Sequence, residues 1–441
     1  MNEQVCKITA EIPLDIDNGC ILDINTTKVT DYTHGFHKYP GKFIPQLPRW
    51  AMRKYLKKGE GKCIIDPFCG SGTTLVEGLL YGHNVIGIDI DPLSVLISKV
   101  KTTKLNVDEV NRISQWILDN MENTEKKFKP KCETINHWFT NDSIKKLSKI
   151  RALIDDIDVV FGSNKEIIDI KEFLIICFSS IIRRASNADN QSQKTYVSGT
   201  KIKEPEEVYN LFRKQVNLYV DRIKEFSNEL NDGIESKVIC FSNNRDLNNK
   251  LENLKVDLAI SSPPYIKSID YVYNQMAELF WIGDLFEMDT QEKQNIKKEK
   301  YIGTSKIFKN EYEEYNPNIS KLNIEELDEK LGGIFVNDIK NGHKHSYITY
   351  KYFVEMEKHF KEMSRNLKKE AHYIMIVGNS TVSNTLFNTS QYLIEIAERN
   401  GFQLVNKWGY KIKNHFMGFD RKGRGGKIEI DWVMDFVLRE F

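Results

Sequence analysis

Residues 62–100, KCIIDPFCGSGTTLVEGLLYGHNVIGIDIDPLSVLISKV, decide the fold. A short apolar run ends at the turn DPFCGSGTT, and helical spacing follows over 75–82 up to a glycine. A second apolar run, 84–90, precedes another helical segment, with Asp91 at the N-cap position and Pro92 in the first turn. Strand, glycine turn, helix, strand and helix in this order predict the opening of a doubly wound α/β fold.

Outside this stretch, the alternation of strand and helix patterns is interrupted twice. Helical patterns fill 105–235, and strand patterns return at 237–242 and 256–265. A polar, lysine-rich stretch, 284–346, shows no firm pattern, and residues 1–30 show no clear period. Two final apolar runs predict a terminal antiparallel hairpin. We therefore expect one mixed sheet of about seven strands with helical insertions.

The expected organisation has six parts. An extension precedes a cofactor-binding part; a helical insertion, a catalytic part, a second insertion and a closing part follow, at 1–36, 37–104, 105–235, 236–283, 284–346 and 347–441. Insertions in an open α/β sheet leave from loops beyond the carboxyl ends of strands, where ligands also bind. Both insertions are therefore candidates for holding a large substrate.

Composition excludes several classes of protein. The 441 residues carry 63 basic and 62 acidic side chains, so a uniformly basic nucleic-acid coat is excluded. No run of ~18 apolar residues predicts a membrane span, and the first residues lack the apolar core of a signal peptide. The seven cysteines form no CxxC pair, which argues against disulfides and structural zinc and favours a reducing cytoplasm.

The glycine turn carries the first chemical signal. Gly70 and Gly72 lack both the third glycine of a dinucleotide fingerprint and the lysine of a phosphate-binding loop. Asp66 at the end of the first strand suits an amino-bearing ligand, and Asp89 at the end of the second can accept hydrogen bonds from ribose hydroxyls. A ribose, an amino group and no phosphate describe S-adenosylmethionine. The alternative is a structural turn with an N-cap aspartate.

Four segments together resemble the amino-directed DNA methyltransferases, which methylate exocyclic amines of cytosine or adenine. DPFCGSGTT and GIDID are similar to motifs I and II, SSPPY (261–265) to the catalytic motif IV, and HKYPGKFIPQLPRW (37–50) to motif X. Looser matches are IDYVYNQMAELFWIGD (269–284), YIGTS (301–305) and IVGNST (376–381). The resemblance implies a Rossmann-like S-adenosylmethionine-dependent methyltransferase fold, with S-adenosyl-L-methionine as cofactor and no metal.

The resemblance also assigns site residues. The implied cofactor-binding residues are Tyr39, Phe43, Pro45, Asp66, Pro67, Phe68, Gly70, Gly72, Thr73, Asp89, Ile90 and Asp246. Asn243 and Asn244 stand where the family usually has an acid near the cofactor's adenine, so that contact departs from the pattern.

The SPPY segment supplies the implied catalytic residues, Ser262, Pro263, Pro264 and Tyr265. An exocyclic amine needs positioning and acceptors for its two protons rather than a nucleophilic cysteine. The Ser262 hydroxyl and the Pro263 carbonyl can accept those protons, the two prolines stiffen the loop, and Tyr265 offers a stacking face to a flipped base.

Two groups of side chains are candidates for contacting DNA. Arg183, Arg184 and Asn187 follow an apolar helix; the alternative is a helix end whose basic residues complement its dipole. Arg421, Lys422 and Arg424 lie in a glycine-rich loop between the last two strands; the alternative is a solvated hairpin tip.

The resemblance implies methylation of double-stranded DNA at a short site, with a cognate restriction endonuclease as a possible partner and no membrane. Serine before Pro-Pro-Tyr favours cytosine N4 in this family. The alternatives are an adenine-N6 enzyme, an RNA methyltransferase, and a non-catalytic DNA-binding subunit.

Overall fold

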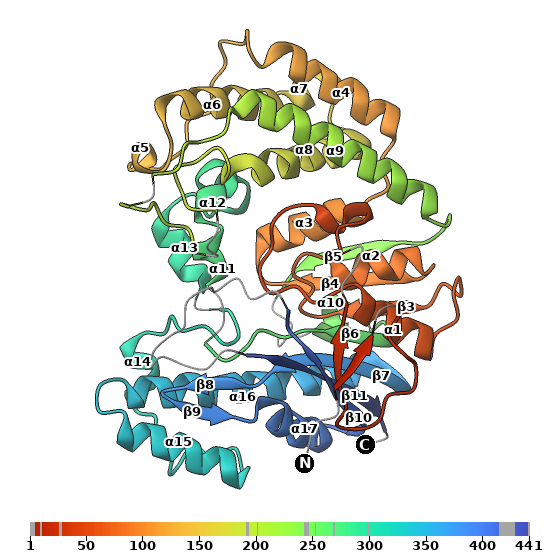
Figure 1. The fold of residues 1–441 in the computed structure, drawn as a ribbon, viewed down its shortest axis with the longest axis vertical. Coiled ribbons are helices and arrows are strands. Elements are labelled where there is room, and N and C mark those ends of the chain that lie inside the picture. Colours follow the sequence, from red (N-terminus) through yellow and green to blue (C-terminus); the bar gives the residue numbers. More distant parts are fainter. Residues whose placement is uncertain are drawn as a thin grey trace.

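A nine-stranded mixed sheet forms the centre of the molecule (Figure 1). The structure, a computed structural model, describes residues 5–8, 11–25, 29–190, 194–200, 202–241, 247–251, 253–267, 270–298, 300–413 and 428–439. In sheet order the strands are β1 (Val5–Ile8), β2 (Ile21–Ile24), β10 (Phe402–Lys411), β11 (Ile430–Leu438), β7 (Leu367–Gly378), β6 (Val256–Ser261), β3 (Cys63–Asp66), β4 (Asn84–Asp89) and β5 (Ser236–Cys240). A separate ribbon pairs β8 (Ser380–Val382) with β9 (Thr385–Phe387).

The stretch 62–100 folds as its pattern predicts. Strand β3 is followed by α2 (Thr73–Leu80), β4 and α3 (Pro92–Thr102). Gly72 caps α2 in the left-handed region, with φ of 79°, which glycine adopts at little cost. Asp91 caps α3, and its side chain accepts a hydrogen bond from the Leu93 amide.

The strand order places a ligand crevice beside β3. The chain runs outward from β3 to β4 and β5, and then returns to add β6 on the other side of β3. These four strands are parallel, so their carboxyl ends lie at one edge of the sheet. An open α/β sheet binds its ligands where the strand order reverses in this way.

Helices cover both faces of the sheet. Neighbouring strand residues point to opposite faces, so Ile64 packs with α1 (Gln46–Tyr55) and α2, whereas Ile65 packs against the other face. That second face is covered by α10 (Leu247–Lys250), α16 (Gly342–Asn366) and α17 (Thr389–Arg399).

The first insertion is a layer of helices at one end of the molecule (Figure 1). It contains α4 (Val107–Asn120), α5 (Ile135–Trp138), α6 (Asn141–Asp155), α7 (Ile157–Phe161), α8 (Lys165–Ile182) and α9 (Val208–Glu229). Its buried core is continuous with α3 and with α12 (Met276–Ile282), which follows the SPPY segment. The buried Trp281 ring of α12 lies near the rings of Phe128, Phe139 and Phe178, at 6.5, 5.6 and 6.2 Å between centroids.

The stretch 284–346, which shows no firm pattern in the sequence, contains helices. These are α13 (Gln291–Lys298), α14 (Lys309–Tyr312), α15 (Glu325–Asn337) and the first residues of α16; a short α11 (Tyr271–Asn274) precedes α12. Leu327, Leu331 and Ile334 bury one face of α15. Their spacing of four and three residues is a helical signal that surrounding charged residues obscure.

The expectation of about seven strands is wrong, because the sheet has nine. The two additional strands, β1 and β2, come from the stretch treated as an unpatterned extension. Each spans four residues, too few to display a period in the sequence, and β2 joins the sheet through parallel pairing with β10. The terminal hairpin of β10 and β11 is antiparallel, as predicted. Among the helices of the described residues, none combines the length and the apolar character needed to cross a membrane.

Candidate active site

The ends of β3 and β6 are joined by side chains. The Ser261 hydroxyl donates to Asp66 Oδ1 at 2.6 Å, and the Thr74 hydroxyl donates to Asp66 Oδ2 at 2.7 Å. Burial raises the pKa of Asp66 to about 6, against the lowering effect of these bonds. Asp66 is buried and does not line the cavity described next, so its carboxylate holds the two strand ends together rather than facing a ligand.

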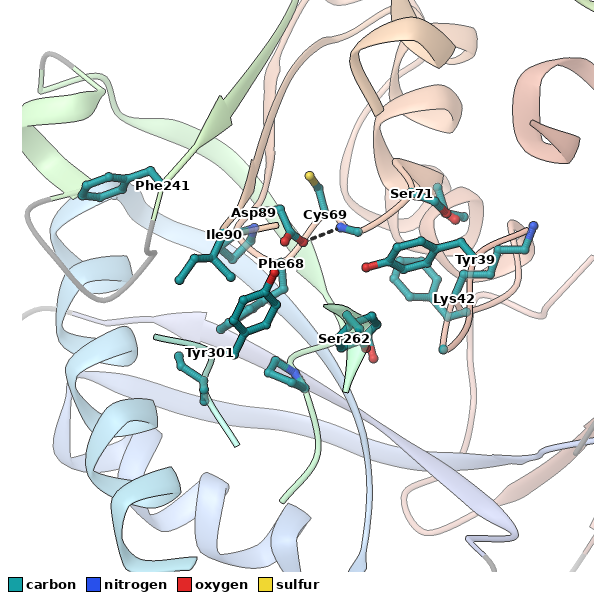
Figure 2. A pocket seen from close by; sticks show the side chains of 18 of the residues that line it. Tyr39, Lys42, Phe68, Cys69, Ser71, Asp89, Ile90, Phe241, Ser262 and Tyr301 are labelled. Atoms are coloured by element: carbon teal, nitrogen blue, oxygen red, sulfur yellow. Dashed lines mark hydrogen bonds between the residues drawn. The ribbon is translucent and has the colours of Figure 1, made fainter. Parts of the chain in front are cut away.

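A cavity of about 760 Å³, measured up to its open mouth, lies at the carboxyl ends of the parallel strands. Its walls come from the glycine turn, the ends of β4 and β5, and the SPPY segment. Figure 2 shows Tyr39 and Tyr301 on either side of it, with Asp89 and Ser262 between them. Predicted site residues that line it are Tyr39, Phe43, Pro67, Phe68, Gly70, Thr73, Asp89, Ile90, Ser262 and Pro264.

Two backbone amides orient the carboxylate of Asp89. The Gly70 N–H donates to Oδ2 and the Asp91 N–H donates to Oδ1, both at 2.9 Å (Figure 2 draws the first). Burial, followed by the charge of Asp91, raises the pKa of Asp89 to about 7. Each carboxylate oxygen keeps a second lone pair, so Asp89 can still accept from two ligand hydroxyls.

Side chains added at the two glycines of the turn would meet other residues of the protein. Gly70 has φ of 48°, and a Cβ there would lie 3.0 Å from the Tyr39 ring. Gly72 does not line the cavity; its Cβ would lie 3.0 Å from Ser98 Oγ on α3. Gly72 therefore permits close packing of α2 and α3.

The SPPY segment divides between the cavity and the core. Ser262 and Pro264 line the cavity, whereas Pro263 and Tyr265 are not among its lining residues. The Tyr265 hydroxyl donates to Asp431 Oδ1 at 2.5 Å, and the Tyr410 hydroxyl donates to Asp431 Oδ2 at 2.9 Å. Tyr265 thus anchors the segment to β11, and its role as the stacking face for a base stays a prediction.

Residues after the SPPY segment complete the cavity. Tyr271 and Tyr301 both line it, and Tyr271 stacks on Tyr39 at 5.7 Å between ring centroids. Tyr301 stacks on Tyr271 at 6.5 Å. Neither ring was assigned a role from the sequence, although both lie in the looser family matches, IDYVYNQMAELFWIGD and YIGTS. Lys42, Phe241 and Lys300 also line the cavity and were not predicted.

Comparison with known proteins finds similarity to DNA methyltransferases. Residues 19–100 match the family model described as DNA methylase. The chain is 28% identical to Type II methyltransferase M.MvaI of Kocuria varians, covering 91% of this chain and 88% of that protein. It is 27% identical to Type II methyltransferase M.MjaII of Methanocaldococcus jannaschii, covering 71% and 74% of the two chains.

These matches confirm the predicted resemblance to the amino-directed DNA methyltransferases. The cofactor of this methyltransferase is S-adenosyl-L-methionine. Among solved structures, a TehB-like methyltransferase of Corynebacterium glutamicum covers 86% of this chain and 81% of that chain, at 9% identity and a TM-score of 0.25. A TM-score this low does not establish a shared fold.

The motif X segment of the methyltransferase forms the outer wall of the cavity. Tyr39 and Phe43 line it, whereas Pro45 is the N-cap residue of α1 and lies outside the lining. Lys42 donates from Nζ to the His34 carbonyl at 3.2 Å, and burial lowers its pKa. Lys42 and the oriented Asp89 carboxylate thus both line the cavity, and this donor and acceptor set fits the two polar ends of S-adenosylmethionine.

The described DNA-contact candidates are occupied by contacts within the protein. Arg183 donates to the carbonyls of Asp189 and Lys194, at 3.0 and 2.8 Å. Arg184 pairs with Glu206, and the Asn187 side chain donates to the His137 carbonyl. These contacts shape the loop after α8, and a DNA contact there stays a prediction. Outside the described residues lie four further predicted residues, Asp246, Arg421, Lys422 and Arg424.

Proposed function

We propose that this methyltransferase transfers a methyl group to the exocyclic amine of a base in a short duplex DNA site, with cytosine N4 as the target. The observation that carries the proposal is that Ser262 and Asp89 line one cavity. Asp89 stands at the end of β4 and Ser262 directly after β6, so the acceptor for a ribose and the acceptor for an amine share one cavity.

Different polar groups of the cavity bind different parts of the cofactor. S-adenosylmethionine supplies a methyl group on a sulfonium centre. Asp89 accepts from the ribose hydroxyls, because two backbone amides fix its carboxylate at the cavity wall. Lys42 pairs with the carboxylate of the methionine end, since it lines the cavity and its ammonium has N–H donors beyond the one given to His34.

The SPPY segment holds the target amine. The Ser262 hydroxyl and the Pro263 carbonyl accept its two protons, which orients the nitrogen toward the methyl group. The two prolines and the bond from Tyr265 to Asp431 limit movement of this segment. Serine is neutral and shorter than the Asp or Asn typical of adenine-directed relatives, which leaves room for a ring placed deeper in the cavity and favours cytosine.

The biological setting that fits a Type II relative is a restriction–modification system. In that setting the methyltransferase protects a site from a cognate endonuclease. The similarity to M.MvaI over most of both chains supports this part of the proposal.

The test is expression in a host without DNA methylation, followed by nucleoside mass spectrometry and mapping of modified bases. We expect N4-methylcytosine at one short sequence, and less of it from the Ser262→Ala variant at equal expression, because that variant loses one acceptor for the amine. N6-methyladenine without N4-methylcytosine would refute the cytosine assignment and leave the DNA methyltransferase assignment standing. Unmodified DNA from a folded protein that binds the cofactor would refute the DNA substrate.

A further inference from the structure

A second hollow lies behind the tyrosines of the cofactor cavity. Its empty space of about 290 Å³ includes open solvent, and it shares Tyr271 and Tyr301 with the first cavity. Its other walls carry Lys298, Lys306 and the hydroxyls of Thr304 and Ser305. The two stacked rings therefore border both a cavity with an oriented carboxylate and a hollow with several hydrogen-bond donors.

The charges of this hollow favour an anion. The acidic side chain that lines it, Asp270, is already engaged: Oδ2 lies 3.2 Å from Lys298 Nζ, and Oδ1 accepts from the Tyr273 amide at 3.0 Å. Lys306 is exposed, and within the described residues it makes no ion pair. A lysine and neighbouring hydroxyls are the side chains that commonly contact phosphate oxygens in protein–DNA complexes.

The hollow is fixed relative to the catalytic segment. Gly303, between Tyr301 and Thr304, has φ of 74°, and a Cβ there would lie 2.4 Å from the Tyr265 carbonyl oxygen. The backbone of 301–303 thus lies directly on the SPPY segment, at a distance that only glycine permits. A group bound in the hollow is held at a set position relative to Ser262.

We propose that this hollow binds the phosphodiester next to the flipped nucleotide, with Lys306 as the main contact. The inference rests on the proposed function, since a base that reaches Ser262 enters the first cavity beside the cofactor and leaves its sugar and phosphate outside. Because the hollow and the first cavity share Tyr271 and Tyr301, they are neighbours, and the phosphate of such a nucleotide would lie in the hollow. The contact fixes how deeply the base enters and carries no sequence information.

Duplex binding by Lys306→Gln, measured by fluorescence anisotropy over a series of salt concentrations, tests this contact. The duplex carries the mapped site. The plot of log K against log salt has a negative slope, and loss of one phosphate contact makes that slope shallower by about 1. Lys309→Gln is the matched control, because Lys309 is exposed three residues away, pairs with Glu313 and does not line the hollow. We expect a reduced slope for Lys306→Gln alone, with unchanged S-adenosylmethionine affinity in both variants.

A second duplex, with a neutral methylphosphonate beside the target base, locates the contact. We expect wild type to bind it more weakly than the native duplex, and Lys306→Gln to bind both equally. Equal slopes for wild type and Lys306→Gln, or equal losses in Lys306→Gln and Lys309→Gln, would overturn the inference while wild-type methylation upholds the proposed function. Absence of both DNA binding and DNA methylation in wild type would overturn both.

Discussion

Replacing Asp89 with alanine is expected to weaken cofactor binding by roughly 10²- to 10⁴-fold. The carboxylate is already oriented by the amides of Gly70 and Asp91, so little is lost in ordering it when a ligand binds. Two hydrogen bonds from ribose hydroxyls to a charged acceptor contribute about 1.5–3 kcal/mol each, or about 3–6 kcal/mol together. Every 1.4 kcal/mol is a factor of about ten in affinity.

The assay is calorimetric titration of S-adenosylmethionine, with circular dichroism to establish that the variant is folded. Asp232→Ala is the control, because Asp232 is an exposed aspartate paired with Lys104, outside the lining of the cavity. A folded Asp89→Ala variant that binds within threefold of wild type would show that the ribose is held elsewhere.

The pH dependence of the same titration gives an independent check. The carboxylate form of Asp89 binds the hydroxyls, and burial raises its pKa to about 7, so below that pH the cofactor-free protein must lose a proton before binding. Affinity should therefore rise about tenfold from pH 6 to pH 8 and level off above. Asp89→Asn has no carboxylate to titrate. The ratio of wild-type to Asp89→Asn affinity should follow this rise, and a constant ratio would refute the argument.

Three further substitutions test other parts of the site and core. Gly72→Ala should lower stability by about 1–3 kcal/mol in urea unfolding, because alanine is strained at φ of 79° and its Cβ meets Ser98; unchanged stability would contradict the close packing. Ser262→Ala should slow methyl transfer roughly tenfold, with cofactor affinity unchanged, since one amine proton loses its acceptor; an unchanged single-turnover rate would remove Ser262 from catalysis. Trp281→Ala should cost about 3–5 kcal/mol of stability in chemical denaturation, and a loss below 1 kcal/mol would show that the shared core does not depend on this ring.

The fold was predictable wherever elements carry a clear period or a cap. The run from β3 to α3 combines two apolar strands, a glycine turn and the Asp91–Pro92 start of a helix, and each of these is local information. Strands β1 and β2 have no comparable signal. Each of these strands has four residues, and they form strands because β2 pairs with the edge of β10 and β1 pairs with β2. This pairing depends on tertiary structure and not on the local sequence.

The residues of the site also differ in whether local sequence was enough to predict their position. Asp89 and Ser262 stand at strand ends within recognisable motifs, and both line the cavity. Asp66 has the right sequence position but faces Ser261 and Thr74, a direction that depends on the pairing of β3 with β6. Tyr271 and Tyr301 join the cavity only through the path of the chain after the SPPY segment, which sequence spacing does not specify.

The position of α12 limits how the helical insertion can be exchanged between proteins. In sequence, α12 lies beyond the catalytic segment, yet Trp281 packs among Phe128, Phe139 and Phe178 of the insertion. A chimera that replaces 105–235 alone would pack the indole of Trp281 against a foreign core that does not match it. A transplant that includes Met276–Ile282 would bring the helix that matches the foreign core. Because that helix follows Ser262 in the chain, the same transplant would also change the residues next to the catalytic segment.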